Sequence, residues 1–197
     1  MLVLAEHDCQ IVGMLSHDKD LSDLEIAIVD LVPVSLSIAF SVRELIRHAL
    51  VPAARILLRP LLERAATVDY LVSEPSALDL WQSGWKHGAR PSFASLLARM
   101  TGSDNEQFRQ ILDVVDDFNS VVHADPAGCR KFAFQHPQFG QRYSLGMTLG
   151  ADEMVSNISA ASAMAVTFLA SNAKRAFRSR ILKHGKEDEL FDFNDGM

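Results

Sequence analysis

Residues 52–72, PAARILLRPLLERAATVDYLV, constrain the fold more than any other part of the chain. Read at helical spacing, their apolar side chains fall on two neighbouring flanks, whereas an amphipathic surface helix has a single apolar stripe. One flank carries Ile56, Leu57, Leu61, Ala65, Val68 and Val72, and the next carries Leu58, Leu62 and Leu71. The segment is therefore predicted to be a helix inside a bundle, with other helices around it.

A line of polar residues runs along the same predicted helix. Arg55, Arg59 and Glu63 follow each other at i, i+4 and i+8. Charges on a buried helix are costly unless they meet partners. Asn119 and His123 are also four residues apart, so they share one face of another predicted helix. We predict that Arg59 and Glu63 face Asn119 and His123 in one polar cluster.

Two interpretations of this cluster stay open. In the first it is a structural network that fixes the register of the helices, which is a frequent role of buried charged groups. In the second it is a ligand-binding or catalytic site, where Arg59 holds an anion and His123 moves a proton. The catalytic candidates are Arg59, Glu63, Asn119 and His123.

Caps, breakers and helical spacing predict further helices before and after the central one. They are expected over residues 22–49, 76–85, 93–100, 103–124 and 152–184. Between the last two, Phe132 and Phe134 alternate with polar residues, as do Tyr143, Leu145 and Met147, which predicts a hairpin. The expected fold class is an all-α helical bundle of about five to seven helices, with a small β-hairpin insertion near residues 130–147.

Length and composition predict one soluble domain. The chain has 197 residues, of which 48% are hydrophobic and 22% charged, and this is ordinary for a globular protein with an ample core. We expect a single domain over residues 1–186 and an acidic C-terminal tail over residues 187–197. Cys9 and Cys129 are too few for a disulfide framework and indicate free thiols in a reducing compartment.

The same reasoning predicts a cytoplasmic protein that does not enter a membrane. The most apolar run, Ile26 to Phe40, is too short to cross a bilayer and contains Asp30 and Pro33. The sequence contains no CxxC pair, HExxH, P-loop, GxGxxG or GxSxG motif, so we expect neither a metal ion nor an organic cofactor.

A basic run near the C-terminus is a candidate nucleic-acid contact. The net charge of −6 gives no general reason to expect such a partner, but a local patch is sufficient for one. The run has no acid within it and is either a solvated helix end or a contact with a phosphate backbone. Its candidate residues are Lys174, Arg175, Arg178, Arg180 and Lys183.

Two segments together carry a family resemblance. Leu57 to Leu71, LLRPLLERAATVDYL, and Phe118 to Pro126, FNSVVHADP, resemble bacterial helical families of unknown function grouped near the HEPN superfamily (higher-eukaryote and prokaryote nucleotide-binding domains). The resemblance covers roughly residues 25–165. It implies a helical bundle, often dimeric, with members in toxin–antitoxin and phage-defence systems, some of which are metal-independent RNases.

The chain departs from the RNases of that superfamily. Those proteins resemble each other in an arginine followed a few residues later by a histidine, on a helix beside the dimer interface. Three pairs fit this spacing: Arg43/His48, Arg130/His136 and Arg178/His184. In a chain with thirteen arginines and seven histidines, such matches are expected by chance. Arg130 and His136 lie on the predicted hairpin, and Arg178 and His184 lie on the exposed basic end of the last helix. This leaves Arg43 and His48 on a bundle helix, where Glu44 stands at a position at which the family tends to place a different polar residue. We therefore do not predict for this chain the nuclease activity of those family members.

Three functions remain open. The first is a HEPN-like protein of a bacterial defence or toxin–antitoxin type system that acts through RNA or a nucleotide. The second is a non-catalytic module that works by dimerisation and partner binding. The third is a small enzyme for an anionic substrate at Arg59, Glu63 and His123. We predict the first, as a homodimer, and leave catalysis open.

Overall fold

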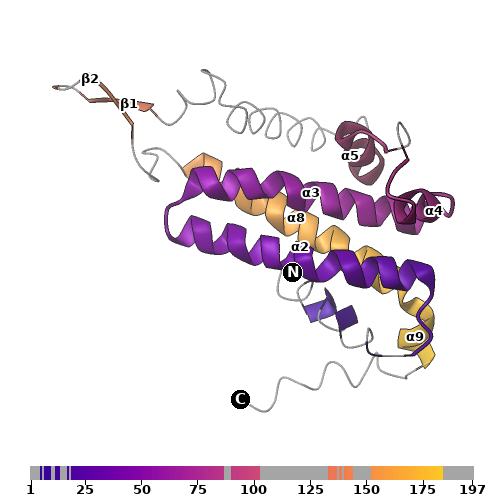
Figure 1. Ribbon diagram of the computed structural model, residues 1–197. Helices are drawn as coiled ribbons and strands as arrows, with labels where there is room; N and C mark the ends of the chain where they lie inside the picture. Colours follow the sequence, from indigo (N-terminus) through magenta and orange to yellow (C-terminus); the bar gives the residue numbers. More distant parts are fainter. Residues whose placement is uncertain are drawn as a thin grey trace, which may run out of the picture.

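The computed structural model describes residues 19–86, 90–102, 133–136, 140–143 and 152–183, with isolated positions in 5–17 and Gln138. Within this part of the chain, three long helices form the body of the protein: α2 (Asp23–Arg47), α3 (Val51–Ser73) and α8 (Asp152–Ala176). Each of the three contacts the other two, and they lie side by side in Figure 1. The helical bundle is therefore confirmed.

Helix α3 is the buried centre, as predicted. Its leucines Leu58, Leu61 and Leu62 are completely buried. The helix packs against α2, α8 and the short α5 (Phe93–Thr101), and it also contacts α4 (Ala77–Gln82). The predicted burial of Ile56 was wrong, because this side chain is 42% exposed. Its direction on the helix points it away from the packed neighbours, so the apolar surface of α3 is broad but not continuous.

Local signals define where the first long helix begins. Ser22 is the N-cap of α2, and its hydroxyl accepts a hydrogen bond from the Glu25 backbone N–H at 3.3 Å. The Glu25 carboxylate accepts one in return from the Ser22 backbone N–H at 2.7 Å, which completes a capping box. Pro33 in α2 and Pro60 in α3 both lie inside continuous helices.

Two predicted helix boundaries and one cap differ from the observed ones. The long final helix is divided at the buried Phe177, after which α9 (Arg178–Lys183) begins. The helix predicted over 76–85 ends at Gln82, because Gly84 and Trp85 adopt positive φ values of 76° and 53°. Ser76 precedes α4 without capping it, since its hydroxyl donates to the Glu74 carboxylate at 3.0 Å.

Two short strands lie in the segment where a hairpin was predicted. Strands β1 (Ala133–His136) and β2 (Gly140–Tyr143) pair antiparallel, with His136 opposite Gly140. The predicted helix over 103–124, the links from the strands to the bundle and the tail over 187–197 lie outside the described residues. A hairpin inserted into the bundle therefore stays a prediction.

Among the described residues, two helices are long and apolar enough to cross a membrane by length and composition. They are α2 and residues Met154–Ala176 of α8, whose most apolar 18-residue stretches have mean hydropathies of 1.8 and 1.4. The prediction from the sequence considered only the shorter run inside α2. Core helices of soluble proteins meet the same criteria, and both helices pack against α3. The cytoplasmic location thus stays a prediction.

Candidate functional site

Arg59 and Glu63 lie half-buried on α3. Glu63 forms an ion pair with Arg90, a residue just before α5 that sequence reasoning did not name. Arg90 is well exposed, with 57% of its side chain accessible, so the pair contributes little to stability. Asn119 and His123 lie outside the described residues, so the predicted cluster with Arg59 and Glu63 stays a prediction.

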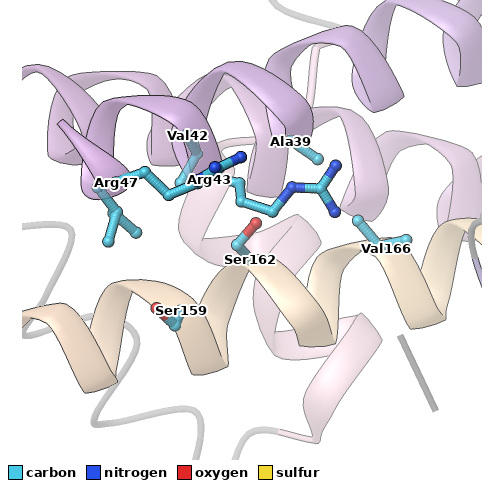
Figure 2. Close-up of a pocket in the computed structure, with 8 residues that line it drawn as sticks. Ala39, Val42, Arg43, Arg47, Ser159, Ser162 and Val166 are labelled. Atoms are coloured by element: carbon cyan, nitrogen blue, oxygen red, sulfur yellow. The ribbon is translucent and has the colours of Figure 1, made fainter. Parts of the chain in front are cut away.

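A pocket of about 230 Å³ lies between α2 and α8. Figure 2 shows side chains from both helices meeting there. The lining residues are Ala39, Val42, Arg43, Ile46, Arg47, Ser159, Ser162 and Val166. The sequence did not indicate which residues of α2 and α8 would face each other here.

The C-terminal end of α2 exposes three basic side chains, Arg43, Arg47 and His48, together with the acid Glu44. The guanidinium of Arg43 lies 4.9 Å from the centre of the Phe40 ring, a cation–π distance. Arg47 lies 3.1 Å from the Glu44 carboxylate, but 71% and 50% of these two side chains are exposed. Water screens such a pair strongly, so Arg47 keeps most of its attraction for an external anion.

The predicted basic run of α8 and α9 is largely occupied by contacts within the protein. The Lys174 ammonium lies 2.9 Å from the Asp8 carboxylate. Arg175 donates hydrogen bonds to the Ser73 hydroxyl and the Val72 carbonyl, both at 3.4 Å. Both cations therefore connect α8 to other parts of the chain. Arg178 is exposed, and the side chain of Lys183 lies outside the described residues.

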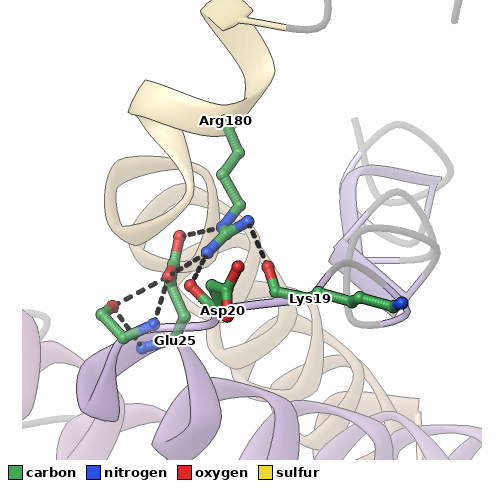
Figure 3. Close-up of polar contacts among 5 residues, drawn as sticks. Lys19, Asp20, Glu25 and Arg180 are labelled. Atoms are coloured by element: carbon green, nitrogen blue, oxygen red, sulfur yellow. Dashed lines mark hydrogen bonds and ion pairs between the residues drawn. The ribbon is translucent and has the colours of Figure 1, made fainter.

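Arg180 is the most strongly engaged member of this run (Figure 3). Its Nε donates to Glu25 Oε1 at 2.7 Å, and its Nη2 donates to Glu25 Oε2 at 3.2 Å. The same guanidinium donates to the carbonyls of Lys19, at 3.3 Å, and Asp20. Only 18% of the Arg180 side chain is exposed. Most of the Arg180 guanidinium is therefore occupied within the protein, because α9 folds back onto the start of α2.

Glu25 is held in its charged form by the same contacts. Burial by itself raises the pKa of Glu25, but the hydrogen bonds from Arg180 and Ser22 stabilise the carboxylate. Their combined effect is larger, so the pKa lies below the ordinary value of 4.5. A single carboxylate thus closes the capping box of α2 and binds the guanidinium of α9.

A second buried polar contact joins α8 to α3. The Asn172 side-chain amide donates to the Asp69 carboxylate at 3.1 Å and to the Phe168 carbonyl at 3.0 Å. Asn172 is 5% exposed, so these bonds satisfy an amide that is removed from water. Sequence reasoning missed this pair, although an asparagine within the apolar part of a long helix is a recognisable signal.

Comparison with known proteins adds no identification. No protein-family model matches the chain, and no curated protein and no solved structure matches it. Within the described ranges, no group of three or more histidine, cysteine, aspartate or glutamate side chains is placed to hold a metal ion.

Proposed function

We propose that this protein binds RNA through the basic end of α2, formed by Arg43, Arg47 and His48. The observation that carries the proposal is their joint exposure over the last turns of α2 and its C-cap His48, at i, i+4 and i+5. Arginine guanidiniums bind phosphate groups in a bidentate manner, and phosphate contacts dominate affinity for nucleic acids. Because the net charge is −6, binding has to come from a local patch of this kind.

Two further considerations support RNA as the partner. The resemblance of residues 57–71 and 118–126 to HEPN-related families favours RNA or a nucleotide and a role in a bacterial defence or toxin–antitoxin system. The competing basic surface is reduced, since Arg180, with only 18% of its side chain exposed, is bound by the Glu25 carboxylate. The proposal concerns binding in the cytoplasm, and RNA cleavage is not part of it because Glu44 follows Arg43.

Replacing both arginines with glutamine tests this site. Fluorescence anisotropy with a labelled single-stranded RNA measures the affinity of wild type and Arg43→Gln/Arg47→Gln over a series of salt concentrations. Each lost phosphate contact lowers the slope of log affinity against log salt by about 0.7, so we expect a decrease of about 1.4 in its magnitude. Both side chains are exposed, so stability should change by less than about 0.5 kcal/mol per residue.

Arg178→Gln is the matched control, because Arg178 is an exposed arginine on α9 rather than α2. It should leave the salt slope unchanged. An unchanged slope in Arg43→Gln/Arg47→Gln would show that the RNA site lies elsewhere, and absence of RNA binding by wild type would refute the proposal.

A specific observation favours one alternative, a non-catalytic homodimeric interaction module. Ile26 and Val34 on α2 are 44% and 45% exposed, and large apolar side chains on a surface are typical of interaction sites. This alternative predicts that light scattering shows a dimer. It also predicts that adding the protein leaves the anisotropy of the labelled RNA unchanged. An enzyme acting on an anion at Arg59, Glu63 and His123 remains a hypothesis.

A further inference from the structure

The pocket between α2 and α8 has an apolar floor. Ala39, Val42 and Val166 line it and are 6%, 1% and 1% exposed, and the half-buried Ile46 adds a fourth aliphatic side chain. Among the described residues that line the pocket, none is aromatic. Proteins recognise nucleobases by stacking on aromatic rings and by hydrogen bonds to base edges. The floor therefore suits an aliphatic group better than a nucleobase.

The rim of the pocket is polar and positively charged. Arg43 and Arg47 come from α2, and Ser159 and Ser162 come from α8. Figure 2 shows the Arg43 side chain extending from α2 over the side of α8 that carries Ser162 and Val166. None of the eight described lining residues is acidic, and Glu44, which pairs with Arg47, is not among them. Guanidinium and hydroxyl groups on opposite sides of one opening are suited to bind a carboxylate by charge-assisted hydrogen bonds.

The size of the pocket limits the ligand. Drug-sized ligands occupy pockets of roughly 300–1,000 Å³, whereas a cavity of about 150 Å³ holds benzene. A volume of about 230 Å³ lies between these cases. It fits one short alkyl chain.

From the floor, the rim and the volume together, we propose that this pocket binds a medium-chain carboxylic acid. The alkyl chain contacts Val42, Ile46 and Val166, and the carboxylate lies at the rim between Arg43 and Arg47 of α2 and the serine hydroxyls of α8. This function is separate from RNA binding and requires no RNA, although an acid bound at Arg43 and Arg47 occupies the groups proposed to contact phosphate.

Calorimetric titration of the full chain with three probes tests the proposal. Octanoate has both features, octan-1-ol has only the apolar chain, and acetate has only the carboxylate. We expect octanoate to bind at least about tenfold more tightly than either of the others, since one charge-assisted contact is sufficient for that ratio. Equal affinities for octanoate and octan-1-ol would overturn the proposal.

Surface variants locate the carboxylate without disturbing the core. Arg43→Gln/Arg47→Gln should weaken octanoate binding by about tenfold or more and leave octan-1-ol binding unchanged, while Arg178→Gln should behave as wild type. Octanoate affinity that is the same in Arg43→Gln/Arg47→Gln and wild type would contradict the assignment. The titrations contain no RNA, so they test the carboxylate site alone. The anisotropy experiment tests RNA binding, and either proposal can therefore fail without the other.

Discussion

Replacing Leu62 with alanine is expected to lower the free energy of unfolding by about 3 kcal/mol, within the roughly 2–5 kcal/mol typical of buried leucines. Leu62 lies on α3 and is 0% exposed. Removing its side chain loses apolar contact area and leaves a cavity that the surrounding helices fill only partly. Urea unfolding followed by circular dichroism measures the change, as a shift of the midpoint at constant slope.

Ile56→Ala is the matched control on the same helix. Ile56 is 42% exposed, so its truncation should cost less than about 1 kcal/mol. Equal losses for Leu62→Ala and Ile56→Ala would contradict the described orientation of α3 in the bundle. This comparison is informative because the sequence pattern placed both residues on buried flanks.

Glu25→Gln is expected to destabilise the protein by about 2–3 kcal/mol. The change leaves the Arg180 guanidinium without its carboxylate, and breaking a buried ion pair costs about 3–5 kcal/mol. We expect a smaller loss of stability than this because the pair is not fully buried: 18% of the Arg180 side chain and 6% of the Glu25 side chain are exposed to solvent. The glutamine oxygen still accepts from Ser22, so the effect reports mainly on the charge. Urea unfolding measures it, and Asp23→Asn, an exposed acid in the same turn, should change stability far less.

The same ion pair predicts a pH dependence. The pKa of Glu25 is lowered in the folded protein relative to 4.5, so its stabilising contribution is complete above about pH 4.5. The contribution is lost as the pH falls below 4.5 through the folded-state pKa. The stability difference between wild type and Glu25→Gln should therefore shrink in acid. A difference that stays constant from neutral pH down to about pH 3 would contradict the lowered pKa.

The sequence predicted those features whose cause is local. Residues 52–72 were identified as a buried helix because leucines on two flanks need neighbours on two sides. The start of the first long helix near residue 22 was predicted because a helix start needs an acceptor for its free N–H groups. The division of the last helix at Phe177 was missed, because residues on both sides keep helical spacing and no glycine or proline separates them.

The site was harder to predict, because its contacts join distant parts of the chain. Arg180 and Glu25 are 155 positions apart, and the basic run looked unpaired only because its acids, Glu25 and Asp8, come from the N-terminal part. Arg43 was singled out for its spacing to His48, whereas its place in the pocket depends on the approach of α8 to α2. Single-sequence patterns do not contain that information.

The enclosed position of α3 between α2 and α8 underlies the placement of the ion pair and the pocket. Native-state amide hydrogen exchange of the full chain tests it most directly. Amides of α3 from Leu58 to Val68 should exchange only through global unfolding, with a free energy equal to that from urea unfolding. Exchange of these amides at a much lower free energy, comparable with that of α4, would contradict a bundle built around α3.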